Sequence, residues 1–117
     1  MSHMLGWYEI HALPGRGRQV VLKDAERRLL LHGVRVRSDA AARAQIEQIR
    51  ESCMLDERYD IKTSATGKWY FYLTGSDQAV LGVSPLAATT EIRDACIMAI
   101  RANGASTSVR DYSRSSP

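Results

Sequence analysis

Residues 67–75 read GKWYFYLTG, and from Trp69 onward residues without a hydroxyl group alternate with residues that carry one. The apolar Phe71 and Leu73 share one side of this alternation, and Tyr70 and Tyr72 share the other. A period of two is typical of a β-strand with one face against a core. The stretch therefore predicts a strand whose Phe71 and Leu73 point inward and whose tyrosines point to the opposite face.

The pattern of apolar positions occurs twice in the chain, at an interval of 51 residues. Aligning the sequence with itself at that offset requires no gaps. A shared spacing of inward-facing side chains is what two copies of one structural unit leave behind. The sequence predicts a tandem duplication inside a single domain (6–112), with repeat 1 at about 7–57 and repeat 2 at about 58–112. The identical pairs include Tyr8/Tyr59, Ile10/Ile61, Leu22/Leu73, Leu30/Leu81, Ala44/Ala95, Ile46/Ile97, Ile49/Ile100 and Arg50/Arg101.

Within each repeat the period changes from two to about 3.6, which predicts three short strands followed by one helix. Ser38 and Thr89 precede the helices and are predicted to cap their first turns. Extended segments are expected after the helices, at Asp56–Thr63 and Thr107–Tyr112, and Gly104 is predicted to end the second helix in a left-handed conformation. The expected fold class is α+β: two β-β-β-α-β units form one antiparallel sheet, with both helices packed on one face.

The ends of the chain and its cysteines bear on processing and compartment. Residues 1–5 are predicted to be a tag-like or disordered N-terminus, and residues 113–117 a flexible tail without an apolar anchor. The sequence contains no run of 18 apolar residues and no signal-peptide pattern. Cys53 and Cys96 are too few for a disulfide framework and are predicted to be reduced and buried. These features predict a cytoplasmic protein without membrane contact.

Several short motifs carry a resemblance to a known family. They are Gly6-Trp7-Tyr8-Glu9-Ile10, the junction Glu57-Arg58-Tyr59-Asp60, residues 67–73, and Arg101-Ala102-Asn103-Gly104. Over Gly6 to about Tyr112 the chain resembles the YegP-like family of uncharacterised small bacterial proteins. The resemblance implies tandem β3-α-β units in one sheet with exchanged C-terminal strands. It implies no activity, because the family has no established catalytic motif to transfer.

The sequence contains no recognisable catalytic or metal-binding constellation. His11 and His32 lie on predicted strands without a cysteine or carboxylate at a metal-ligand spacing. The segment 14–18 reads PGRGR, but it lacks the phosphate-loop spacing and precedes a strand instead of a helix. We therefore expect no enzyme activity, no metal and no cofactor.

Charge is the feature with a possible bearing on partners. The chain has 16 Lys and Arg against 13 Asp and Glu, which gives a net charge of +3. A total this small does not indicate a particular class of partner. The excess is concentrated in the first three predicted strands, whereas aromatic residues gather in the second repeat. The candidate binding residues are Arg16, Arg18, Lys23, Arg27, Arg28, Tyr70 and Tyr72.

Two functions remain open on these residues. The first is a non-enzymatic interaction module that binds an unknown protein or a second copy through the open sheet face or the sheet edges. The alternative is binding of single-stranded nucleic acid, such as RNA, in which tyrosines stack on bases and cations meet phosphates. The sequence contains no RNP motif to favour the alternative.

Overall fold

The computed structural model describes residues 4–113 and shows two runs of three strands, each followed by a helix, with a short strand at the end. Two single-turn 3₁₀ helices, η1 and η2, lie in connections. The elements are β1 (Trp7–Ala12), η1 (Pro14–Arg16), β2 (Arg18–Lys23), β3 (Leu29–Gly33), α1 (Asp39–Ser52), η2 (Asp56–Arg58), β4 (Tyr59–Thr63), β5 (Trp69–Thr74), β6 (Val80–Val83), α2 (Thr90–Asn103) and β7 (Val109–Asp111).

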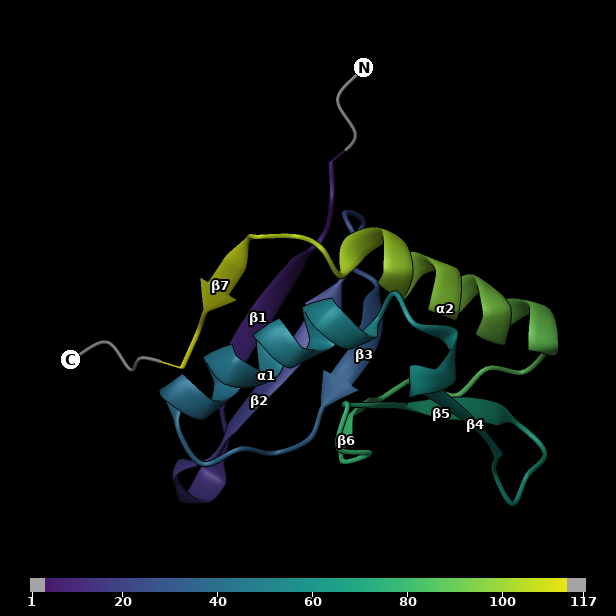
Figure 1. Cartoon of the computed structure of the whole chain (residues 1–117), viewed down its shortest axis with the longest axis horizontal. Helices are drawn as coiled ribbons and strands as arrows, with labels where there is room; N and C mark the ends of the chain where they lie inside the picture. Colours follow the sequence, from purple (N-terminus) through teal and green to yellow (C-terminus); the bar gives the residue numbers. More distant parts are fainter. Residues whose placement is uncertain (1–3, 114–117) are drawn as a thin grey trace.

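All seven strands form one sheet in the order β4-β5-β6-β3-β2-β1-β7, and α1 and α2 lie on the same face of it (Figure 1). The predicted α+β class and the placement of both helices on one face are thus confirmed. The expectation of a wholly antiparallel sheet is wrong, because β7 runs parallel to β1. The Asn103 side chain at the end of α2 accepts the N–H of Gly6 at 2.8 Å, so the chain leaves α2 near the start of β1 and runs along it in the same direction.

The two halves match element by element at the interval of 51 residues. Helices α1 and α2 begin at residues 39 and 90, and strands β2 and β5 begin at 18 and 69. The predicted caps are confirmed: Ser38 Oγ accepts the N–H of Ala41 at 3.0 Å, and Thr89 Oγ1 accepts that of Ile92 at 3.1 Å. Descent from a duplicated unit stays a prediction.

Each helix ends against the first strand of the other half. The Tyr8 hydroxyl donates to the Gly104 carbonyl at 2.8 Å, and the Tyr59 hydroxyl donates to the Cys53 carbonyl at 2.7 Å. Cys53 and Gly104 are the C-caps of α1 and α2, and a Cβ on Gly104 would lie 2.5 Å from the Cys53 Sγ. The expected left-handed stop is wrong, since Gly104 has φ −64°. Glycine is required there by the close approach of the two helix ends.

The core lies between the helices and the covered face of the sheet. Phe71 and Leu73 are buried in it, as their alternation predicts. Helix α2 is less covered than α1, and Ile92, in its first turn, is 53% exposed. Residues 56–58, expected to be extended, form η2 instead. In the described part of the chain, no helix has the length and apolar character to cross a membrane.

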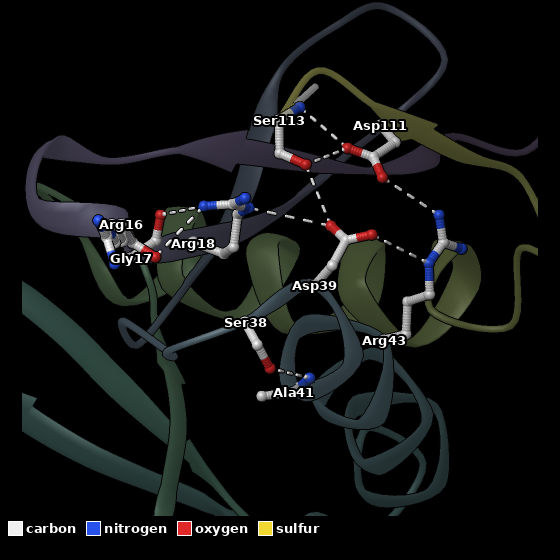
Figure 2. A network of polar contacts seen from close by, with 9 residues as sticks. All are labelled: Arg16, Gly17, Arg18, Ser38, Asp39, Ala41, Arg43, Asp111 and Ser113. Carbon is white, nitrogen blue, oxygen red and sulfur yellow. Dashed lines mark hydrogen bonds and ion pairs between the residues drawn. The ribbon is translucent and has the colours of Figure 1, made fainter. Parts of the chain in front are cut away.

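Strand β7 is fastened to the N-terminal turn of α1 by a polar network (Figure 2). Asp111 pairs with Arg43 at 3.3 Å, and the Ser113 hydroxyl lies 3.0 Å from Asp39 Oδ1. The Ser113 N–H donates to Asp111 Oδ1 at 2.9 Å. The sequence predicts a flexible tail (113–117), but Ser113 is buried, because these bonds continue the order of β7 by two residues. The rest of that tail, like residues 1–3, lies outside the described part of the chain.

Candidate functional site on the open face of the sheet

The predicted basic residues do not form one surface. Arg16 is exposed in η1 at the end of β1, and Arg18 begins β2 on the helix-covered side. Arg18 Nε lies 3.9 Å from Asp39 Oδ1, and its Nη1 donates to the Gly17 carbonyl at 3.1 Å (Figure 2). Arg18 is therefore engaged within the fold and faces away from the open face.

The other predicted cations lie at the far end of β2. Arg27 and Arg28 belong to the turn between β2 and β3, where Arg28 Nε pairs with the buried Asp24 at 2.8 Å. Arg27 has φ 67° and is exposed. Lys23 faces the open side, and its Nζ lies 3.2 Å from Glu9 Oε1. Six residues of β2, about 20 Å of extended chain, separate the two basic ends.

The predicted aromatic residues lie together on β5. The rings of Tyr70 and Tyr72 meet edge to face with their centroids 5.7 Å apart, and the β4 residues opposite them are Lys62 and Asp60. Desolvation and the neighbouring Tyr72 raise the pKa of Tyr70 above its ordinary value. Strands β6 and β3 separate these tyrosines from β2. The structure thus brings the two tyrosines together and leaves the arginines elsewhere.

One row of directly paired residues crosses the open face from edge to edge. It contains one residue of every strand, and six of its seven residues form three pairs separated by 51 positions, whereas Arg110 has no counterpart in it. We call it the open-face row; in spatial order it is Asp60, Tyr72, Val83, His32, Val21, Glu9 and Arg110.

Glu9 is the centre of a buried polar cluster at the β1 end of this row. It is 5% exposed, and its Oε2 accepts the Trp7 Nε1–H at 2.8 Å. His11 Nε2 lies 2.7 Å from Oε1, which Lys23 also contacts. Burial raises the pKa of Glu9, but the hydrogen bonds from Trp7, His11 and Lys23 outweigh it and hold the pKa below its usual value.

Residues of β7 and its continuation cover this cluster. The Arg110 guanidinium carbon lies 3.6 Å from the centroid of the Trp7 ring, and the Tyr112 ring stacks on His11 with centroids 5.3 Å apart. The sequence interpretation missed Glu9 as a site residue. The available signal was the i, i+2 spacing of Trp7, Glu9 and His11, which places them on one side of a strand.

The remaining features that could support chemistry in the described part of the chain are metal ligands, thiols and cavities. Across residues 4–113 there is no group of three or more His, Cys, Asp or Glu that would hold a metal ion. Cys53 is buried, and burial raises the pKa of Cys96 to about 11, so neither thiol is activated as a nucleophile. An apolar hollow of about 330 Å³ lies on the helix side, between α2 and the residues Leu86, Leu30 and Arg28. Its polar lining is the buried Asp24 carboxylate, which already accepts the backbone N–H groups of Glu26 and Arg28 and the Arg28 guanidinium.

The fold and this face define a class: small α+β proteins with one helix-covered sheet face and one polar, aromatic open face. A solved solution structure of an Escherichia coli protein of unknown function, yegP, has the same fold, with a TM-score of 0.92, 30% identity and coverage of 99% of this chain and 100% of that one. A Shewanella oneidensis UPF0339 protein superposes with a TM-score of 0.89 at 25% identity, over 94% of this chain and 93% of that one.

Sequence comparison gives the same answer. The UPF0339 protein YegP of Escherichia coli K12 is 32% identical over 108 residues, which cover 92% of this chain and 98% of that protein. The YegP protein of Shigella flexneri matches to the same extent. No protein-family model matches the chain. The chain belongs to the UPF0339 (YegP) family, as its motifs suggested, and the names of these relatives indicate no enzymatic family.

Proposed function

We propose that the protein is a non-enzymatic interaction module that binds a protein partner through the open face of its sheet. The observation that carries the proposal is the asymmetric open-face row. At the β1 end Glu9 is buried next to β7, whereas at the β4 end no part of residues 4–113 covers Tyr72 and Asp60 in this way. Interface centres favour tyrosines, and charged residues belong to the polar rim around such a centre.

The contact would centre on Tyr70 and Tyr72. Their rings already hold each other in place, so little side-chain freedom is lost when a partner packs on them. Lys62, opposite Tyr70, and Asp60, opposite Tyr72, supply charges at the rim that orient the partner. We place this module in the bacterial cytoplasm, where the two free thiols stay reduced.

The test is affinity purification from a bacterial lysate, with and without nuclease. The baits are the unaltered protein, Tyr70→Ala/Tyr72→Ala, and Met98→Ala as a matched control, because Met98 is 71% exposed on α2, away from the open face. We expect specific proteins that survive nuclease, persist with Met98→Ala and are lost with the tyrosine variant. An unchanged set of proteins with the tyrosine variant would overturn the proposal.

Single-stranded RNA is the second candidate, favoured by one observation: two neighbouring aromatic rings lie beside the Lys62 ammonium on an uncovered sheet face. Base stacking on aromatic residues contributes about 1–3 kcal/mol per base. Fluorescence anisotropy with labelled oligonucleotides at low salt tests it. Binding that weakens with salt and is lost in Tyr70→Ala/Tyr72→Ala supports RNA, and no binding at low salt eliminates it.

A further inference from the structure

The two edges of the sheet are built from equivalent strands but differ in their cover. On one edge, β7 lies along β1: the Tyr8 N–H donates to the Ser108 carbonyl at 3.0 Å, and the Tyr112 N–H donates to the Ile10 carbonyl at 2.8 Å. Strand β4 occupies the corresponding place in the second half and pairs only with β5. Within residues 4–113 no segment covers its outer edge.

Side chains of β4 are more exposed than their equivalents in β1. Ile10 is fully buried, whereas Ile61, its equivalent 51 residues later, is 38% exposed. The Glu9 side chain is 6% exposed, whereas that of its equivalent Asp60 is 54% exposed. An uncovered strand with an apolar side chain at a core position is a template for pairing with another strand.

The backbone of β4 presents defined groups to its free side. The Ser64 N–H donates to the Lys68 carbonyl at 2.7 Å, so this opposed pair is hydrogen-bonded across the hairpin. The alternation of an antiparallel ladder then turns the N–H and C=O of Ile61 and Thr63 outward. Tyr59 also faces outward, but its N–H donates to the Asp56 carbonyl in η2 and only its carbonyl is free.

We propose that the free edge of β4 binds β4 of a second copy in antiparallel orientation, with Ile61 opposite Ile61. This register places Asp60 of each copy opposite Lys62 of the other, so the strand is complementary in charge to itself. The charged residues lie on the open-face side and Ile61 on the helix side, which gives ion pairs on one side of the junction and an apolar contact on the other. The two sheets become one continuous sheet.

Antiparallel pairing also fits the available backbone groups better than a parallel segment placed as β7 is on β1. The Tyr8 N–H donates to the Ser108 carbonyl, just before β7. Its equivalent, the Tyr59 N–H, already donates to the Asp56 carbonyl in η2. The antiparallel register does not need it. Two bonds join the Ile61 residues, and the Thr63 N–H of each copy reaches the Tyr59 carbonyl of the other.

A charge-exchange experiment tests the proposal with full-length protein. Asp60→Lys places like charges opposite each other in the pair, and so does Lys62→Asp. Analytical ultracentrifugation should show a concentration-dependent dimer, twice 13.0 kDa, whose Kd rises about tenfold or more in each single variant. An equimolar mixture of the two variants restores unlike charges at both positions, so it should associate as tightly as the unaltered protein. Circular dichroism confirms that each variant is folded.

Cysteine cross-linking fixes the register. Directly opposed Cα atoms in a hydrogen-bonded antiparallel pair lie about 5.5 Å apart, within the range a disulfide spans. Ile61→Cys should form a disulfide-linked dimer on mild oxidation. Thr63→Cys, the matched control, lies opposite Tyr59 and should remain monomeric, as should the unaltered chain with its own two cysteines.

A monomer at all concentrations, a mixture no tighter than either variant, or equal cross-linking of Thr63→Cys would overturn the inference. It goes beyond the proposed function because it concerns the edge of the sheet. Purified protein alone reports on the dimer, whereas loss of lysate proteins from the Tyr70→Ala/Tyr72→Ala bait reports on the open face. Failure of one is therefore distinguishable from failure of the other.

Discussion

Replacing Gly104 with alanine tests the packing of the two helix ends directly. The backbone at Gly104 has φ −64°, which alanine adopts without strain. The added methyl group would lie 2.5 Å from the Cys53 Sγ and 2.8 Å from the Ile100 carbonyl oxygen. Both separations are about 1 Å shorter than an ordinary van der Waals contact of roughly 3.5–4.0 Å. Any cost of the substitution therefore comes from packing and not from backbone conformation.

The expected cost follows from the burial of the neighbouring groups. Cys53 is fully buried and held at the C-cap of α1, so it has little room to move. Inserting a methyl group into such a place costs about 1–3 kcal/mol of unfolding free energy. At roughly 4–5 °C per kcal/mol for a domain of this size, Tm should fall by about 5–15 °C. In the absence of the steric conflict the same change would raise stability by up to about 1 kcal/mol, because alanine restricts the unfolded chain.

A double-mutant cycle with Cys53→Ala isolates the contact. Unfolding by urea or heat is measured for the unaltered protein, both single variants and the double variant. Gly104→Ala should cost at least about 1 kcal/mol less in the Cys53→Ala background, because the Sγ that obstructs the methyl group is gone. Rescue should be incomplete, since the Ile100 carbonyl remains. Strictly additive effects, or a Gly104→Ala protein as stable as the unaltered one, would refute the reasoning.

Three further predictions concern the Glu9 cluster and Tyr8. Because the Glu9 pKa lies below its usual value, the carboxylate stabilises the fold above the unfolded-state pKa, about 4.3, and this contribution is lost as pH falls through the folded-state pKa. Glu9→Gln should therefore lower Tm at pH 7 and flatten the decline of Tm between about pH 5 and 3. An unchanged dependence of Tm on acid pH would contradict this. Arg110→Ala should expose Trp7, shift its fluorescence to longer wavelength and cost about 0.5–1 kcal/mol in chemical unfolding. Tyr8→Phe leaves the Gly104 carbonyl without its donor and should cost about 1–2 kcal/mol in the same assay, with no loss counting against that hydrogen bond.

Local sequence patterns predicted the main strands and helices and their order along the chain. The alternation around Phe71 predicted β5, and hydroxyl side chains at Ser38 and Thr89 predicted where the helices begin, because capping bonds form within a few residues. The 51-residue interval predicted that the second helix would repeat the first, and α1 and α2 do start 51 residues apart. Family motifs in the chain led to the correct family.

Long-range geometry lay outside the reach of those patterns. Nothing local shows that Gly104 lies against Cys53, so the sequence predicts a left-handed helix end at Gly104, whereas the structure has φ −64° there. The direction of β7 depends on where α2 ends relative to β1, and the order of Ser113 depends on Asp39, which is 74 residues away. The Glu9 cluster likewise needs Lys23 from the neighbouring strand and Arg110 from the far end of the chain.

The sequence by itself determined the period-two strands, the capped helices, the repeat interval and the core-facing side of the strand around Phe71, because these follow from side-chain chemistry along the chain. Only the tertiary structure decided that, among residues 4–113, a strand covers the outer edge of β1 and none covers that of β4. The two strands have equivalent sequences and equivalent places in the sheet, but the chain that leaves α2 continues as β7 beside β1, whereas the chain that leaves α1 continues as β4 itself. Within residues 4–113, β7 is the strand added after the second helix, and it lies beside β1.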